Sequence, residues 1–162
     1  MAVLVAYAGK HGSTQGIAER IAEKLRQLEK QAEARPMEAV EDLGNYEALV
    51  IGSAIYYGSW SKEATAWVHR NQAALAGRPV WLFSVGPLGT EVKDDEQQPK
   101  ELAEFQEAIR PRDQRIFFGA LDHSQLSFTE RMMAKAVRAP EGDFRDWQAI
   151  EAWAESIAQD LG

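Results

Sequence analysis

A glycine-rich segment with two hydroxyls follows the first apolar run of this sequence. It reads Gly9, Lys10, His11, Gly12, Ser13, Thr14. Glycines let the backbone approach an anion closely, hydroxyls donate to it, and a helix starting here points its free N–H groups at the same place. The segment predicts a site for a phosphate monoester, but not a Walker A loop, because no Gly-Lys-Ser/Thr closes it. A plain turn in which Ser13 or Thr14 caps the helix is an equal alternative for this segment alone.

Two further segments suit a flat aromatic ligand. The second segment, 52–60, follows another apolar run and contains Tyr56, Tyr57 and Trp60. Aromatic faces stack on a flat ring while backbone amides bond to its edge, so this segment predicts a ring wall. One of the three aromatics is expected to pack against the next helix instead. The third segment, 84–89, is Ser-Val-Gly-Pro-Leu-Gly. Its backbone can approach the same ring from the other side, although alone it is typical of a simple turn.

Composition leaves a bound organic cofactor as the source of any redox chemistry. The 162 residues include no cysteine, which excludes disulfides, thiolate nucleophiles and cysteine-ligated iron–sulfur clusters. The three histidines, His11, His69 and His123, lack the spacing of a metal site. No paired carboxylates or Ser–His–Asp set stand out. A net charge of −7 argues against non-specific nucleic-acid binding and suits docking to a basic redox partner.

The apolar runs are too short to cross a membrane as a helix. None approaches the roughly 18 residues that a spanning helix needs. The first residues also lack the basic, apolar and small-residue regions of a signal peptide. We therefore expect a cytoplasmic protein without a transmembrane segment.

Alternating strands and helices must position the three segments. Continuous apolar runs predict strands buried on both faces at 3–8, 48–54 and 80–85. Less apolar strands are expected at 32–38 and 116–121. Amphipathic spacing predicts helices that begin near Ser13, Lys62, Leu102 and Asp146. This rhythm predicts a single α/β domain over 1–162, with helices on both faces of a parallel sheet.

Five strands in this rhythm suit the order 2-1-3-4-5, in which a ligand binds at the carboxyl ends of the strands near the switch point. The dinucleotide-binding Rossmann arrangement is the weaker alternative, because Gly-x-Gly-x-x-Gly is absent after the first strand. The acidic stretch 90–98 is expected to be an exposed loop.

An extra segment, 122–143, interrupts the rhythm between the last strand and the last helix. Ser127 followed by Glu130 is typical of a capping box and predicts a helix through Val137. Two interpretations stand side by side. The segment is either a lid that only packs on the domain, or a cover over a cofactor edge that docks a bulky apolar substrate, a quinone or a membrane face.

These motifs resemble a known family. Tyr7 through Thr14 resembles the phosphate loop of flavodoxins, and 52–58 resembles the corresponding loop of flavodoxin-domain proteins related to menaquinone-dependent protoporphyrinogen IX dehydrogenase. The extra segment is similar to that subgroup too, at Phe128, Arg131, Met132 and Lys135. The resemblance covers nearly the whole chain and implies a flavodoxin-like three-layer sandwich around a five-stranded parallel sheet.

The resemblance also implies FMN as the cofactor. It implies phosphate contacts from Lys10, His11, Gly12, Ser13 and Thr14. It implies ring and ribityl contacts from Ala54, Ile55, Tyr56, Tyr57 and Gly58. Further contacts are expected from Ser84, Val85 and Gly86. No catalytic side chain is assigned, since the flavin carries the electron chemistry.

The resemblance predicts an FMN-binding redox protein, with a porphyrinogen or quinone oxidoreductase as its more specific form. A one-electron flavodoxin carrier that meets a redox partner protein is the alternative. A flavodoxin-fold protein that binds a deazaflavin or no cofactor is another, because Ala8 and Gly9 stand where flavodoxin phosphate loops usually begin with Ser or Thr. The oligomeric state, and contact with a membrane surface, are left open by the sequence.

Overall fold

Five parallel strands form the centre of the structure, a computed structural model that describes residues 2–9, 13–44, 46–56, 59–86, 101–117, 120–121, 142–143 and 146–161. They are β1 (Ala2–Ala8), β2 (Gln31–Pro36), β3 (Tyr46–Tyr56), β5 (Val80–Val85) and β6 (Asp113–Phe117). Their order across the sheet is β2-β1-β3-β5-β6, and each neighbouring pair is parallel. Counted along the chain this is the order 2-1-3-4-5, so the predicted sheet is confirmed.

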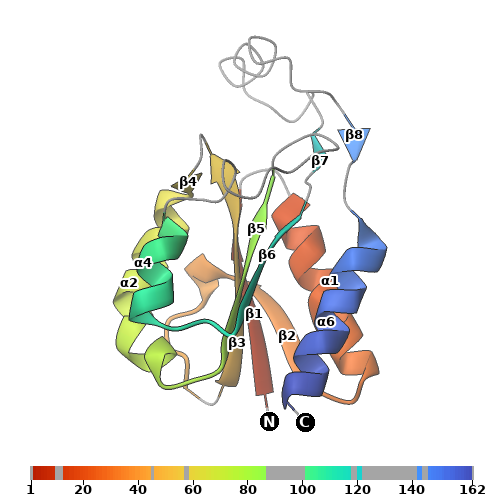
Figure 1. The fold of residues 1–162 in the computed structure, drawn as a ribbon, viewed down its shortest axis with the longest axis horizontal. Helices are drawn as coiled ribbons and strands as arrows, with labels where there is room; N and C mark the ends of the chain where they lie inside the picture. The colour runs from red at the N-terminus through yellow and green to blue at the C-terminus, as the bar shows by residue number, and fades with distance from the viewer. Residues whose placement is uncertain are drawn as a thin grey trace.

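Helices cover both faces of this sheet, as Figure 1 shows. One face carries α1 (Ser13–Gln27) and α6 (Trp147–Leu161). The other carries α2 (Lys62–Ala76), α4 (Glu101–Ala108) and the short 3₁₀ helix η1 (Met37–Ala39). In β1, Val3 and Val5 pack with α1 and α6, whereas Leu4 and Ala6 face the opposite layer, because successive strand residues point to opposite sides. The unbroken apolar run of β1 therefore reflects burial on both faces.

Helix α2 begins at Lys62, where the sequence predicts. Ser61 is the N-cap of α2, and its side chain accepts a hydrogen bond from the Ala64 N–H at 3.1 Å. Gly77 is the C-cap.

In the described part of the chain, no helix is long and apolar enough to cross a membrane.

Two strand boundaries differ from the sequence prediction. The last strand of the sheet was expected at 116–121, but β6 begins at Asp113 and ends at Phe117. Residues 113–115 are polar because β6 is an edge strand of the described sheet and stays partly exposed, so an apolar run is a poor guide to where it begins. The strand predicted at 48–54 extends in the structure to Tyr56, where it forms a hairpin: β4 (Ser59–Trp60) pairs antiparallel with the end of β3.

The segment after β6 starts and ends in a small ladder of its own. Strand β7 (Ala120–Leu121) pairs antiparallel with β8 (Gly142–Asp143). In Figure 1 this ladder lies beyond the carboxyl ends of the parallel strands. The helix predicted from Ser127 to Val137 and the acidic loop predicted at 90–98 lie outside the described residues.

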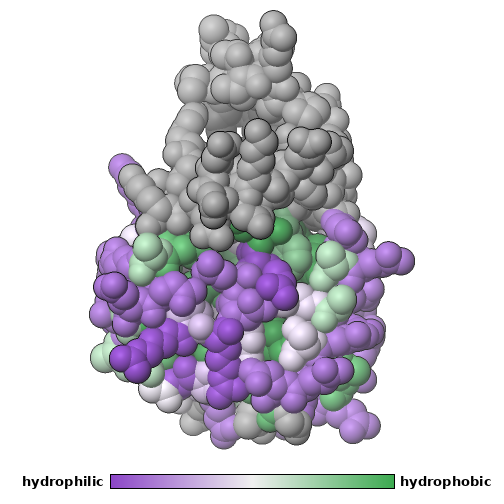
Figure 2. Space-filling model, in the orientation of Figure 1, coloured by the Kyte–Doolittle hydropathy of each residue, from purple (hydrophilic) through white to green (hydrophobic). Residues whose placement is uncertain are grey.

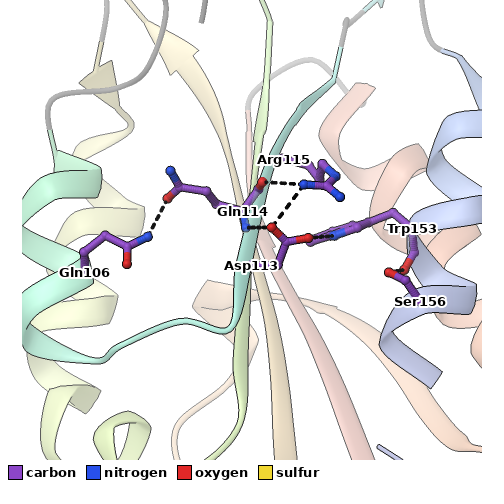
Figure 3. A network of polar contacts seen from close by, with 6 residues as sticks. All are labelled: Gln106, Asp113, Gln114, Arg115, Trp153 and Ser156. Atoms are coloured by element: carbon purple, nitrogen blue, oxygen red, sulfur yellow. Dashed lines mark hydrogen bonds and ion pairs between the residues drawn. The ribbon is translucent and has the colours of Figure 1, made fainter. Parts of the chain in front are cut away.

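Hydrogen bonds attach the edge strand β6 to the helices on both sides of it (Figure 3). The Asp113 carboxylate accepts from the Trp153 indole of α6 at 3.0 Å and from Arg115 at 3.0 Å. On the other side, Gln106 of α4 donates to the Gln114 side chain at 3.1 Å. The polar residues that made the start of β6 hard to predict therefore fix its position between the two helical layers.

The centre of the sheet depends on one close approach between neighbouring strands. Gly52 of β3 lies opposite Phe83 of β5. A Cβ atom placed on Gly52 would lie 2.0 Å from the Cζ of Phe83, inside the ring's own volume. Phe83 in turn packs against Phe117 and Trp153, with ring centroids 6.4 and 6.2 Å away. Glycine at this position therefore makes room for the aromatic core under α6.

Gly52→Ala is expected to lower the free energy of unfolding by about 1–3 kcal/mol, because the added methyl overpacks the core. Gly77→Ala is the matched control. It has nothing within 4 Å of the added atom and a φ of −94°, so it should change stability by less than about 1 kcal/mol. Urea denaturation of both variants measures this. Combining Gly52→Ala with Phe83→Leu should recover part of the loss, and equal losses for the two alanine variants would contradict the packing argument.

Candidate functional site

The three segments singled out in the sequence leave the sheet side by side. The register places Ala8 of β1 opposite Ser53 of β3, and Ala54 opposite Val85 of β5. The carboxyl ends of all three strands therefore meet at one edge, as predicted. In Figure 2 hydrophobic residues of the described surface gather along this end, while hydrophilic residues dominate the remainder of the view.

Contacts join the first segment to the second and the second to the third. A Cβ atom on Gly9 would lie 3.6 Å from the Ala54 Cβ, so the two backbones are close neighbours. A Cβ atom on Gly86 would lie 3.6 Å from the Ile55 Cβ. Gly86 also has a φ of +119°, a conformation that strains any other residue. The structure therefore brings Ala54, Ile55, Val85 and Gly86 together with Gly9.

The structure describes only some of the predicted contact residues. Lys10, His11, Gly12, Tyr57 and Gly58 lie outside the described residues. For Ser13 and Tyr56 the backbone alone is described, as the first residue of α1 and the last of β3. Their contacts with a cofactor stay predictions.

Thr14 is the most informative residue of the phosphate segment. It lies in the first turn of α1 and its side chain is only 2% exposed. Its hydroxyl oxygen is buried and has no hydrogen-bond partner among the described residues. A buried hydroxyl without a partner is costly, and most such groups in proteins are paired. An acceptor that arrives with a ligand would satisfy it.

The surroundings of Thr14 favour an anion as that acceptor. The first turn of α1 contains no acidic residue, unlike those of α2 and α4. The free N–H groups and the positive end of the helix dipole therefore face no protein carboxylate in that turn. Gly9 is pressed against Thr14, since a Cβ atom there would lie 2.7 Å from the Thr14 oxygen. A phosphate group fits this set of donors.

Tyr7 stands two residues before Gly9 and stays uncharged. Burial, and then the nearby carboxylates of Glu19 and Glu38, raise the pKa of the Tyr7 phenol above its ordinary value. The phenol is therefore protonated at neutral pH, and it places no negative charge beside the predicted phosphate segment. Its ring packs in the core under α1.

Two buried serines at this end of the sheet are already hydrogen-bonded. Ser53 accepts from the Ser61 N–H at 3.1 Å and donates to the Ala54 carbonyl at 2.8 Å. Ser84 accepts from the Trp60 indole at 2.8 Å and is 1% exposed. Thr14 differs from both serines in having no such partner.

Trp60 is an aromatic of the second segment that packs inward, as expected for one of the three, but its partners were not predicted. Its side chain is 3% exposed and its ring lies 5.3 Å from the Phe105 ring of α4. Its backbone N–H donates to Glu101 at 3.2 Å. These residues are 41 positions apart, so no local spacing could have linked them.

Among the described residues, no three acidic, histidine or cysteine side chains form a group that could hold a metal ion. The arrangement places a buried hydroxyl and the first turn of α1, which contains no acidic residue, beside closely packed strand ends. Such a site can hold an anionic group and a flat body next to it.

Comparisons with known proteins agree with this geometry. The Flavodoxin domain family model matches residues 4–148. Protoporphyrinogen IX dehydrogenase (quinone) of Escherichia coli strain K12 is 24% identical over 172 residues, which span 98% of this chain and 95% of that protein. The match to the protein of the same name from Escherichia coli O157:H7 has the same extent.

Solved structures share the fold. An archaeal flavodoxin superposes with a TM-score of 0.68 at 16% identity, and flavodoxin 2 of Bacillus cereus with 0.65 at 21%; each match covers 99% of both chains. Rubredoxin oxygen:oxidoreductase of Desulfovibrio gigas gives 0.67 at 13%, over 99% of this chain and 36% of that one.

Thr14→Val should stabilise the ligand-free protein by about 1 kcal/mol, because an isosteric methyl replaces a buried hydroxyl that has no partner among the described residues. Thr65→Val on α2 is the matched control. Its hydroxyl donates to the Ser61 carbonyl at 3.1 Å, so the same substitution there should be neutral or destabilising. Urea denaturation of both variants tests this, and a loss of stability at Thr14 equal to that at Thr65 would refute an unpartnered hydroxyl.

Proposed function

We propose, since this chain belongs to the Flavodoxin domain family, that it binds FMN at the carboxyl ends of β1, β3 and β5 and works as a redox protein. The observation that carries the proposal is the Thr14 hydroxyl, which is buried in the first turn of α1 and has no hydrogen-bond partner among the residues that the structure describes. FMN differs from riboflavin by a phosphate, and a phosphate oxygen is the acceptor that this hydroxyl lacks. The match of the family over residues 4–148 supports the same cofactor.

The phosphate end of the site is formed by α1 and the segment before it. Thr14 donates its hydroxyl, and the first backbone N–H groups of α1 point the same way. We propose that Lys10, His11, Gly12 and Ser13 complete the cradle. The close packing of Gly9 on Thr14 leaves little room for a side chain at Gly9. Flavodoxin phosphate loops usually begin with Ser or Thr, whereas this chain has Ala8 and Gly9 there. Thr14 would therefore supply the side-chain hydroxyl for the phosphate.

The ring end of the site is formed by the other two segments. We propose that Ala54, Ile55, Tyr56, Tyr57 and Gly58 contact the ring and ribityl chain on one side, and Ser84, Val85 and Gly86 on the other. The Gly86 N–H already donates to the Phe117 carbonyl at 2.9 Å. Gly86 would thus contribute close approach of its Cα rather than a hydrogen bond. When bound, FMN supplies the electron and hydride transfer, and the protein positions it.

We further propose that the protein is an oxidoreductase that acts on a porphyrinogen or a quinone. The support is the relative named protoporphyrinogen IX dehydrogenase (quinone), which matches along nearly its full length. A one-electron carrier is the second candidate. It is favoured by the net charge of −7, which suits electrostatic docking to a basic partner protein.

FMN should bind in a one-to-one ratio, and Thr14→Val should weaken FMN by about 1–3 kcal/mol while changing riboflavin much less, because only FMN carries the phosphate. Titration of both ligands by flavin fluorescence quenching measures this. Thr65→Val controls for a general effect of the substitution. Equal loss for FMN and riboflavin would mean that Thr14 is not at the phosphate. Selective binding of a 5-deazaflavin instead would keep the fold and overturn the cofactor.

The FMN-loaded protein is expected to oxidise a porphyrinogen with a quinone as electron acceptor, followed by the rise of porphyrin fluorescence. The protein without flavin serves as the control, since the electron chemistry depends on the flavin. If the loaded protein shows no such turnover but exchanges single electrons reversibly with a reductase, the carrier function replaces the enzyme.

A further inference from the structure

Trp60 stands at the cofactor end of the sheet but is packed inside the layer formed by α2 and α4. It ends β4, the strand that folds back on the end of β3, and it pairs directly with Ile55. Its side chain is 3% exposed and belongs to the core cluster that includes Trp67 and Phe105. A residue so buried is unavailable as a stacking surface, although it is part of the segment that carries the proposed ring contacts.

Three contacts fix Trp60 to neighbouring elements. Its indole N–H donates to the Ser84 hydroxyl of β5 at 2.8 Å, in a buried hydrogen bond. Its backbone N–H donates to the Glu101 carboxylate at the start of α4, at 3.2 Å. Its ring lies 5.3 Å from the ring of Phe105, also on α4, at a tilt of 58°. Trp60 therefore connects β4 to both β5 and α4.

A hydrogen bond between Ser61 and Ser53 also fixes the β3–β4 hairpin. The Ser61 N–H donates to the Ser53 hydroxyl at 3.1 Å, directly after Trp60 in the chain. The return strand of the hairpin is thus anchored on consecutive residues. Ile55, paired with Trp60, lies next to Gly86 of the third segment. The position of Trp60 therefore determines how the second and third segments meet.

We propose that Trp60, with Ser84 and Glu101 as its acceptors, is a positioning residue that sets the backbone of Ile55 and Tyr56 against the flavin ring. This inference rests on the proposed function. The inference goes beyond the proposed function because it predicts an effect on the ring end of the site alone. We call Trp60, Ser84 and Glu101 the clamp. Loosening the clamp should lower the affinities for FMN and for riboflavin by the same factor, because both ligands carry the ring. It should also shift the flavin midpoint potential, because backbone groups at the ring edge tune its electronics.

Trp60→Phe tests this arrangement, and a control variant must match the cavity that the smaller ring leaves. Phenylalanine keeps an aromatic ring beside Phe105 and removes the indole donor to Ser84. Trp67→Phe is the matched control. Trp67 is also fully buried in the same cluster, but its indole N–H donates to the Val40 carbonyl, 3.5 Å away, and not to a residue of the three segments. Both variants lose one buried indole N–H, so they should lose similar stability.

Loss of the buried hydrogen bond in Trp60→Phe should weaken FMN and riboflavin each by about 3- to 10-fold, and Trp67→Phe by less than about twofold. Glu101→Gln keeps an oxygen acceptor for the Trp60 N–H and should stay near wild type, whereas Glu101→Ala should resemble Trp60→Phe. Fluorescence titration gives the affinities, and equilibration with reference dyes gives the midpoint potential.

The clamp is refuted if Trp60→Phe and Trp67→Phe bind both flavins alike and have the same midpoint potential. A loss confined to FMN would also overturn it, because that pattern belongs to the phosphate end. Should Trp60→Phe fail to fold, Glu101→Ala and Glu101→Gln carry the same comparison. Failure of the proposed function is a separate result, since there the wild-type protein itself binds no flavin.

Discussion

Parallel pairing of β1, β3 and β5 is the constraint on which the site and the core both depend. Strands in parallel need crossover connections, and these supply the helices that cover both faces of the sheet. The same crossovers all leave from the carboxyl ends of the strands. Because the register places Ala8 opposite Ser53 and Ala54 opposite Val85, the three departing segments begin close together. The core that holds the strands thus also creates the place where a ligand can bind.

Hydroxyl groups at that edge divide into two kinds. In the described part of the chain the buried polar residues are Thr14, Ser53 and Ser84. The two serines are paired within the protein and connect the β3–β4 hairpin to its surroundings. The Thr14 hydroxyl has no hydrogen-bond partner within the described ranges. The edge therefore combines serine hydroxyls that are hydrogen-bonded within the protein with a threonine hydroxyl that can still donate to a ligand. Rigid surroundings with a group left over for a ligand are what a preorganised binding site requires.

Much of the fold could be predicted from the sequence because buried parallel strands leave an apolar run, as at Val80–Val85. The convergence of the three segments at one edge could be predicted because each follows such a run. The start of β6 could not, because an edge strand tolerates the polar residues Asp113 to Arg115. The contacts of Gly9 with Thr14, and of Trp60 with Glu101, join residues through space. Local spacing and periodicity contain no signal for them.

The β7–β8 ladder has a consequence for how such a chain can diversify. Ala120 pairs with Asp143 and Leu121 with Gly142, so the chain that leaves the ladder returns to it before α6 begins. Closing a longer loop raises the entropic penalty only slowly with length. Insertions or deletions between these two short strands would therefore leave the register of the main sheet untouched. The paired ends therefore separate the length of the intervening sequence from the geometry of the parallel core.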